Sequence, residues 1–557
     1  MGNFDEVFDW VVVGSGAGSM VSGLVMRRAG HSVAICEKTP YIGGTTAKSG
    51  GVMWIPNNRF IRAEEPDESA EKAIAYLDAV CEDLPGSNHE KRLAYVNEAP
   101  RMIDFLIDRG VELERGSRFW PDYYDDAPGG CQTSRSVTAR YFNLKELGPW
   151  EQKLRPGFLP FPTRLDDGMK TAFRAKSKAY ARIYRRTVLR TILGKLTFKH
   201  WAAAGAALQG RMLKASLAAG VDVRTDTPVK QLIVEQGKVT GVIAEVDGQT
   251  RRIGARLGVL VNAGGFAQNQ ALRDQYMPGT GAEWSQTPEG DTGEMHVELQ
   301  LIGGVLGQMD QMVGYQMTRA PGWEAMYVKP PGQSLTGKPG SILVDQSGVR
   351  YLNEGGSYEL YCQSMIERNR TVPAIPSWAL FDQRYVEDYQ VAYQNLKTAT
   401  IARWREAGYL KTAPTIEGLA GQIGVDPATL RATVDRWNGM VDKGVAEDFG
   451  RGEREYDKWL GDPFLGGNPA LGKLAKAPFY AVDVVPGDVS TYGGVIVDAQ
   501  SRVLTADGEP ISGLYACGVT TASVMGGVYP GAGASIGPSM TFGYIAARHA
   551  AGLGNQP

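Results

Sequence analysis

The stretch WVVVGSGAGSMVSGLVMRRAGHSVAICEK, from Trp10 to Lys38, decides the fold class. Its first residues form a short, continuous apolar run, which is typical of a strand buried on both faces of a parallel sheet. Gly14 and Gly16 then allow a tight turn, and the helix that follows points its free N–H groups at an anion. Glu37 ends the next apolar run, where a carboxylate can bind ribose hydroxyls. The stretch predicts a dinucleotide-binding α/β domain.

A second glycine-rich loop follows Glu37 closely, with Gly43, Gly44 and Thr45 and then Lys48 to Gly51. Two distant segments, VLVNAGGFAQN (259–269) and GLYACGVTTAS (513–523), read as strands that end in glycine. A domain that binds NAD needs none of these returning segments. Their placement resembles flavoproteins of the fumarate reductase and succinate dehydrogenase superfamily, and this resemblance implies FAD as the cofactor.

The predicted FAD contacts come from all of these glycine segments and from the start of the last helix, in ASIGPSMTFGYIAARHA (534–550). No pattern indicates covalent attachment, so we expect the flavin to be bound non-covalently. The residues expected to hold it are Gly14, Gly16, Ala17, Gly18, Glu37, Lys38, Gly43, Gly44, Thr45, Ser49, Gly50, Gly51, Ala263, Gly264, Gly518, Ala534 and Ile536.

The spacing of these segments predicts a discontinuous Rossmann-like FAD-binding domain, formed by residues 1–281 and 481–557. Residues 282–480 lie between the two parts and are expected to form an inserted α+β catalytic domain that caps the flavin. Residues 223–261 alternate apolar and polar side chains around QGK and DGQ turns, which predicts a β-meander.

The composition is that of a globular protein, with 43% hydrophobic and 22% charged residues. The net charge of −2 gives no reason to expect nucleic-acid binding. The five cysteines are scattered, without a CxxC pair or a metal-ligand spacing, which indicates reduced thiols and no metal site. We see neither a signal peptide nor an apolar run of the ~20 residues that a membrane span needs, so we expect a cytoplasmic protein.

One segment departs from this balance, because residues 170–200 contain ten Lys or Arg and no Asp or Glu. Apolar side chains recur along it every four residues, at Tyr180, Tyr184, Val188, Ile192 and Leu196. A basic amphipathic helix of this kind suits the surface of an anionic bilayer, and a solvated helix that packs on its own domain fits equally well. We therefore treat residues 165–205 as a basic amphipathic insertion that leaves peripheral association with the inner face of the cell membrane open.

Three tyrosines stand in unusual contexts, in PDYYDDAPGG (121–130), NEGGSY (353–358) and YPGAG (529–533). Together with GGTTAKSGGVMWIPNN (43–58) and SWALFDQRY (377–385), these motifs are spread along the whole chain. In combination they are far more specific than a glycine-rich turn. The sequence resembles the 3-ketosteroid Δ1-dehydrogenases.

The resemblance implies roles for the motif residues in converting a 3-keto-4-ene steroid to the 1,4-diene. Tyr358 would remove the proton from C2 with support from Tyr123, and Tyr124 is the alternative to Tyr123. The Tyr529 hydroxyl and the Gly533 N–H would hold the C3 carbonyl, and flavin N5 would accept the hydride from C1. Two donors at the C3 oxygen stabilise the developing enolate, an effect worth ~3 kcal/mol for each donor. Tyrosine with its ordinary pKa of ~10 is a poor base, so we expect a hydrogen bond from Tyr123 to favour ionised Tyr358.

The small residues Gly526 to Val528 before Tyr529 predict a wide pocket and, with the basic helix, a steroid that retains its side chain. The expected electron acceptor is a quinone or another carrier, since no iron–sulfur or second nucleotide motif is visible. Three alternatives stay open: a 3-ketosteroid Δ4-(5α)-dehydrogenase, a fumarate-reductase-like enzyme that reduces unsaturated acids, and a flavin-binding redox sensor or membrane scaffold without turnover. The five histidines form no clamp for a carboxylate, which disfavours the second.

Overall fold

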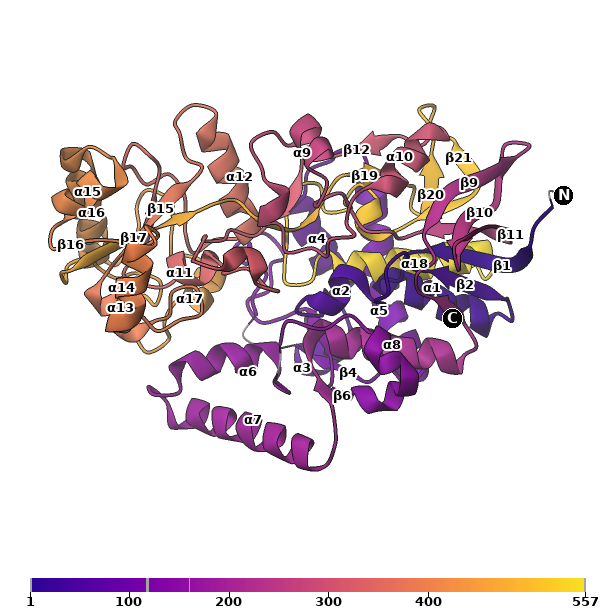
Figure 1. Ribbon diagram of the computed structural model, residues 1–557, viewed down its shortest axis with the longest axis horizontal. Helices are drawn as coiled ribbons and strands as arrows, with labels where there is room; N and C mark the ends of the chain where they lie inside the picture. Colours follow the sequence, from indigo (N-terminus) through magenta and orange to yellow (C-terminus); the bar gives the residue numbers. More distant parts are fainter. Residues whose placement is uncertain (1–2, 117–119, 160, 555–557) are drawn as a thin grey trace.

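The computed structural model describes residues 3–116, 120–159 and 161–554. Two separate sheets lie towards opposite ends of the molecule, and both chain termini lie at the end with the larger sheet (Figure 1). Short helices and two-stranded pairings connect the two ends.

The larger sheet has eight strands in the order β20-β21-β10-β11-β1-β2-β8, with β9 paired to β10. Its centre is parallel, because β1 pairs in parallel with both β11 and β2, and β2 with β8. Trp10 to Val13 in β1 are buried, as the apolar run predicts. The strands are β1 (Glu6–Val13), β2 (Val33–Cys36), β8 (Asp222–Arg224), β9 (Val229–Glu235), β10 (Lys238–Val246), β11 (Gln249–Val261), β20 (Arg502–Leu504) and β21 (Pro510–Ala516).

The predicted β-meander is confirmed, since β9, β10 and β11 pair in sequence as antiparallel neighbours. Four helices pack around the parallel centre of the sheet, and α1 contacts both α18 and α8, while α18 also contacts α5. Their bounds are α1 (Ala17–Arg28), α5 (His89–Asp108), α8 (Ala204–Ala218) and α18 (Ile536–Ala550).

The second sheet is antiparallel, in the order β14-β15-β17-β16. Its last strand in the chain, β17, crosses residue 481, where the predicted second part of the FAD-binding domain begins. The strands are β14 (Ser341–Val344), β15 (Ser377–Asp382), β16 (Lys411–Ala413) and β17 (Phe479–Val484). The helices beside this sheet are α11 (Gln333–Thr336), α12 (Tyr358–Asn369), α13 (Gln383–Asp388), α14 (Thr398–Glu406), α15 (Ile416–Ile423), α16 (Pro427–Lys443) and α17 (Glu455–Leu460).

Small elements join these two parts. The remaining strands are β3 (Val52–Trp54), β4 (Leu113–Arg115), β5 (Ser136–Ala139), β6 (Phe142–Asn143), β7 (Trp201–Ala202), β12 (Leu306–Gly307), β13 (Met312–Gly314), β18 (Asp488–Thr491) and β19 (Gly494–Val495). The remaining α-helices are α2 (Gly44–Lys48), α3 (Arg59–Glu64), α4 (Ala70–Val80), α6 (Leu165–Lys170), α7 (Lys178–Leu196), α9 (Gln270–Tyr276) and α10 (Glu294–Leu301).

The basic insertion forms an arm of two helices, α6 and α7, along the lower edge of the molecule in Figure 1. Serine 177 caps α7 by accepting a hydrogen bond from the Tyr180 backbone N–H. Among the helices that the structure describes, none combines the length and the apolar character that crossing a bilayer requires.

Candidate active site

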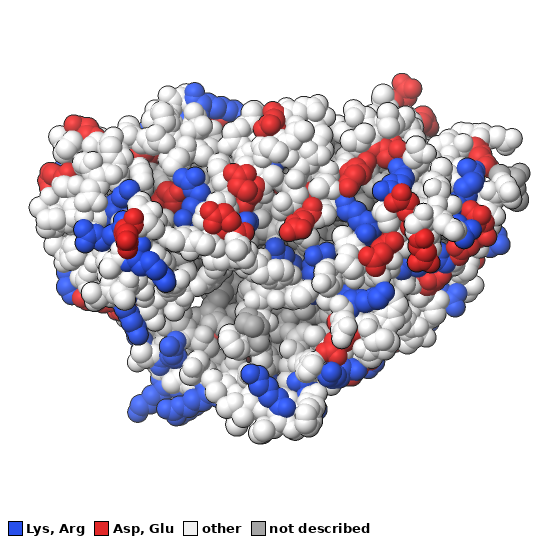
Figure 2. Space-filling model, in the orientation of Figure 1, with Lys and Arg blue, Asp and Glu red and all other residues white. Residues whose placement is uncertain are grey.

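A cavity of about 1640 Å³ lies between the two ends of the molecule. It is larger than the ~300–1,000 Å³ of pockets that hold one small molecule, so it has room for a cofactor and a second ligand. Figure 2 shows the surface hollowed at the lower centre, between the two ends and above the arm formed by α6 and α7. Its walls are the glycine-rich loops, a group of tyrosines and one face of α7.

The glycine-rich wall contains most of the predicted FAD contacts. The predicted residues that line the cavity are Gly14, Gly16, Glu37, Lys38, Gly44, Thr45, Ser49, Gly50, Gly51, Ala263, Gly264 and Ile536. Five others, Ala17, Gly18, Gly43, Gly518 and Ala534, are not part of the cavity wall. Of these, Gly18 lets α1 pack closely on α18, because a Cβ there would lie 2.4 Å from the Ser539 carbonyl oxygen.

This wall fits the diphosphate of a dinucleotide. The helix α1 begins beside Gly16 at the cavity and has no acidic residue in its first turn, so its free N–H groups and dipole favour an anion. Gly14 has φ +91°, and a Cβ there would lie 2.3 Å from the Asn262 carbonyl oxygen. Only glycine therefore lets β1 turn into α1 this close to the end of β11.

Glu37 and Lys38 lie at the far end of the same wall. The Glu37 carboxylate accepts hydrogen bonds from the Ser15 hydroxyl (2.6 Å) and from the Thr39 backbone N–H (2.9 Å). It thereby ties the turn after β1 to the end of β2. The Lys38 ammonium pairs with Glu294 at 2.8 Å.

The three predicted catalytic tyrosines come together in the structure from three distant segments. The ring centroids of Tyr123 and Tyr358 are 5.4 Å apart, those of Tyr358 and Tyr529 are 5.4 Å apart, and those of Tyr123 and Tyr529 are 5.8 Å apart. Tyr358 is the first residue of α12, at the edge of the cavity. Tyr124 points away from this group, and its hydroxyl donates to Glu359 at 3.3 Å. The geometry therefore places Tyr123, and not Tyr124, beside Tyr358.

Tyr529 and Gly533 form a pair of donors at one point of the wall. The Tyr529 hydroxyl shares a hydrogen bond with the Ser535 hydroxyl at 3.2 Å, and the backbone N–H groups of Gly533 and Ser535 lie near enough to lower its pKa. Gly533 has φ +95°, and a Cβ there would lie 2.3 Å from the Val52 carbonyl oxygen, so glycine is required where this loop crosses β3. A phenol and a backbone N–H directed at the same place can bind a carbonyl oxygen from two sides.

A buried ion-pair network holds this loop against the Tyr123 segment. The fully buried Arg135 binds Asp122 at 2.6 Å and Glu68 at 2.8 Å, and Asp122 accepts from the Trp54 indole at 2.8 Å. The Tyr123 backbone N–H then donates to the Pro530 carbonyl at 2.9 Å. This packing fixes the distance between Tyr123 and the donor pair.

Burial raises the pKa of Tyr358 well above its ordinary value, and the neighbouring hydroxyls of Tyr123, Tyr529 and Tyr456 raise it further. The expectation that a hydrogen bond from Tyr123 favours ionised Tyr358 stays a prediction, and burial is the main cause of the raised pKa of both phenols. Because burial dominates the shift, Tyr358 is a neutral phenol at neutral pH.

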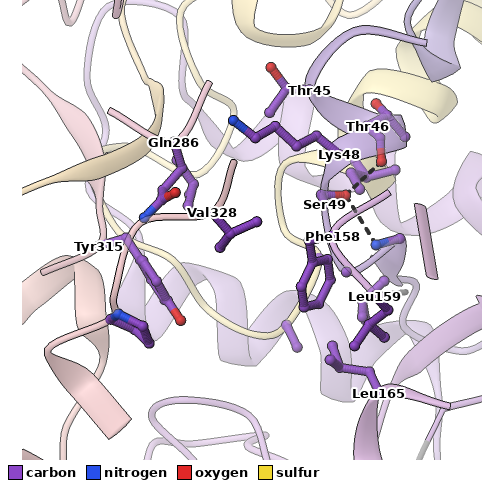
Figure 3. Close-up of a pocket in the computed structure, with 18 of the residues that line it drawn as sticks. Thr45, Thr46, Lys48, Ser49, Phe158, Leu159, Leu165, Gln286, Tyr315 and Val328 are labelled. Atoms are coloured by element: carbon purple, nitrogen blue, oxygen red, sulfur yellow. Dashed lines mark hydrogen bonds between the residues drawn. The ribbon is translucent and has the colours of Figure 1, made fainter. Parts of the chain in front are cut away.

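The sequence analysis missed two further tyrosines and one carboxyl group at this site. Tyr456 of α17 lies 4.2 Å from Tyr123 between ring centroids and accepts a hydrogen bond from the Gln333 amide at 3.1 Å. Tyr315 lies 5.3 Å from Tyr358 and lines the cavity, where Figure 3 shows its side chain. Glu359 is fully buried directly after Tyr358. None of the three stands in a recognisable motif, so no local signal pointed to them.

Comparison with known proteins shows the family to which this chain belongs. Residues 9–536 match the family model described as an FAD binding domain. The chain is 36% identical to a 3-oxosteroid 1-dehydrogenase of Mycobacterium tuberculosis over 98% of both chains. It is 32% identical to a 4-oxocyclohex-2-ene-1-carboxylate 5-dehydrogenase of Sinomonas cyclohexanicum, over 98% of this chain and 94% of the relative.

A solved structure agrees at the level of the whole fold. The 3-ketosteroid Δ1-dehydrogenase from Sterolibacterium denitrificans, in complex with 1,4-androstadiene-3,17-dione, matches with a TM-score of 0.90 and 32% identity, over 98% of this chain and all of the other. The chain therefore belongs to the FAD-binding flavoenzyme family that includes the 3-oxosteroid 1-dehydrogenases.

Proposed function

We propose that this protein is a 3-ketosteroid Δ1-dehydrogenase, which converts a 3-keto-4-ene steroid to the 1,4-diene. The observation that carries the proposal is the donor pair of Tyr529 and Gly533 in contact with Tyr358. A ketone oxygen bound by this pair brings the adjacent C2 carbon towards the Tyr358 hydroxyl. The relatives with this activity, similar over nearly their full length, support the same function.

The position of each residue in the site suggests its role in the reaction. The ionised form of Tyr358 takes the C2 proton, the two donors stabilise the negative charge that develops on the C3 oxygen, and Tyr123 and Tyr456 extend the hydrogen-bonded group of phenols. FAD bound along the glycine-rich wall would supply the hydride acceptor for C1. A quinone or another carrier then reoxidises the enzyme. In this proposal residues 1–281 and 481–557 form a discontinuous Rossmann-like FAD-binding domain, and residues 282–480 form the catalytic domain that caps it.

The test is anaerobic mixing of the purified holoenzyme with androst-4-ene-3,17-dione, followed by the visible absorbance of the flavin. We expect bleaching and a 1,4-diene product, and we expect Tyr358→Phe to slow the bleaching by about 10²–10⁴-fold, as for the loss of a general base. Tyr124→Phe serves as a control from outside the ring group and should have a much smaller effect.

Two results would contradict the proposal. A spectrum that stays unchanged with 3-ketosteroids of several side-chain lengths would exclude the reaction. A 5α-saturated substrate that yields only a 4-ene product would instead assign the protein as a Δ4-(5α)-dehydrogenase.

We also propose that this protein works in the cytoplasm and docks on the inner face of the cell membrane through the outer side of α7. Leu189, Leu193, Leu196 and Phe198 are exposed there, the last two by 69% and 81%. Arg182, Arg185 and Arg186 are exposed on the same helix, and Figure 2 shows Lys and Arg side chains along this lower edge. Apolar side chains among basic ones suit an anionic bilayer surface, where sparingly soluble steroids collect.

A further inference from the structure

The inner side of α7 forms part of the cavity wall. Four of the five residues of the predicted apolar stripe, Tyr180, Tyr184, Val188 and Ile192, line the cavity that also contains Tyr358 and Tyr529. The fifth, Leu196, does not line the cavity and is 69% exposed, so only the first four stripe residues face the active-site cavity. One continuous space leads from the donor pair to the arm.

The arm is anchored on both sides of this space. Lys176 pairs with the buried carboxylate of Asp462 at 2.7 Å, and the rings of Tyr180 and Phe464 are 5.6 Å apart, which ties the arm to the inserted domain. On the other side, the Arg190 guanidinium stacks over the Tyr141 ring at 4.5 Å and donates to the Pro162 carbonyl at 2.7 Å. These contacts hold the stripe towards the cavity.

The stripe is apolar but not covered by protein. Val188 and Ile192 are exposed by 38% and 50%, although they face the interior of a cavity. Apolar surface in water is unfavourable, so an apolar ligand that covers these side chains is stabilised. Exposed apolar side chains inside a concave site indicate a ligand surface.

The passage between the tyrosines and the stripe is also mainly apolar. Figure 3 shows Phe158, Leu159 and Leu165 across the cavity from Tyr315 and Val328. The charged side chains near its ends have partners: the Lys48 ammonium lies 4.7 Å from the centroid of the Tyr327 ring, and Lys170 pairs with Asp166 at 3.2 Å. The passage therefore suits a hydrocarbon chain better than a charged group.

We propose that Tyr184, Val188 and Ile192 form a subsite for the alkyl side chain at C17 of a 3-ketosteroid. This inference rests on the proposed function, because a C3 ketone held by Tyr529 and Gly533 directs the opposite end of the steroid away from the donor pair. A rigid ring system leaves its side chain at that opposite end. The cavity offers an apolar surface for it on α7, and the enzyme then prefers steroids that retain a side chain.

Two neighbouring residues on α7 allow a matched test. Ile192 and Leu193 are both exposed by 50%, but only Ile192 lines the cavity. The measurement is kcat/KM for cholest-4-en-3-one and for androst-4-ene-3,17-dione, both dispersed with cyclodextrin so that no membrane is needed. Ile192→Glu should lower the ratio of kcat/KM for cholest-4-en-3-one to kcat/KM for androst-4-ene-3,17-dione by about tenfold or more, as expected when a hydrophobic contact is lost. Leu193→Glu should leave the ratio at its unmodified value.

A second pair, Val188→Glu on the inner side and Leu189→Glu on the outer side, repeats the comparison if one variant folds poorly. The subsite is refuted if the unmodified enzyme does not use the side-chain-bearing steroid, or if inner and outer variants change the ratio equally. Failure of the unmodified enzyme to use either steroid would refute the proposed function itself, which separates the two ideas.

Discussion

Glu359 shows how a single buried residue affects this site. Its carboxyl group accepts a hydrogen bond from the Tyr124 hydroxyl at 3.3 Å, and the Tyr529 backbone N–H lies near enough to lower the pKa of Glu359. Burial raises the pKa of Glu359 to about 8. The group is therefore neutral at pH 7, which suits a position near an oxygen that becomes negative during the reaction.

We expect the pH dependence of kcat/KM to report this group. Because the pKa of Tyr358 is raised, its ionised fraction increases about tenfold per pH unit throughout the measurable range. In the unmodified enzyme this rise should flatten above pH 8, where Glu359 becomes negatively charged and opposes charge on the C3 oxygen. Glu359→Gln keeps the acceptor and removes the ionisation, so its rate should continue to rise and exceed the unmodified rate by about tenfold at pH 9.

The check is a profile of kcat/KM between pH 6 and 10 for both proteins. Identical profiles for the two proteins would mean that ionisation of Glu359 does not cause the flattening above pH 8. If Glu359→Gln instead lost activity equally at every pH, the role of Glu359 would be purely structural.

At the scale of single elements, α7 has two sides with different surroundings. Its helical period predicted a helix and an apolar stripe, and both are present. The sequence could not show whether the stripe faces a membrane or a cavity of the protein, because both surroundings favour the same apolar side chains. The contacts of Lys176 with Asp462 and of Arg190 with Tyr141 decide this, and they join residues far apart in the chain.

The outer side of α7 leads to a prediction about membrane binding. Replacing Arg182, Arg185 and Arg186 with Ala should weaken binding to vesicles that contain phosphatidylglycerol by about 3 kcal/mol, roughly 100-fold, since each basic residue near such a surface contributes ~1 kcal/mol. Co-sedimentation measures the bound fraction. As a control, replacing Arg251, Arg252 and Arg256 on β11 removes the same charge from another part of the surface. Equal binding by both triple variants would show that α7 does not dock on the membrane.

At the scale of the whole molecule, the cofactor wall joins three distant parts of the chain. Gly14 and Gly16, Ala263 and Gly264, and Ile536 all face one cavity. A ligand that binds only the folded protein adds about 2.7 kcal/mol at one hundred times its dissociation constant. For a protein of 557 residues, that energy raises Tm by about 2–3 °C.

We therefore expect removal of FAD to lower Tm by this amount, and FAD to restore it. Riboflavin is the control, because it lacks the diphosphate that the N-terminus of α1 would bind, and it should restore little. Calorimetry or circular dichroism during heating measures the change. A Tm that does not depend on FAD would mean that these segments are not joined by the cofactor.

The sequence alone determined the features that depend on neighbouring residues. The apolar run of β1, the glycine turn into α1 and the β-meander follow from local conformational preferences, and the motifs around Tyr123, Tyr358 and Tyr529 identified the family. Only the tertiary structure decided which side chains meet. It placed Tyr456 and Tyr315 beside the predicted tyrosines, turned Tyr124 towards Glu359, raised the pKa of Tyr358 and turned the α7 stripe to the cavity. These outcomes depend on packing and desolvation between distant segments, which no local pattern encodes.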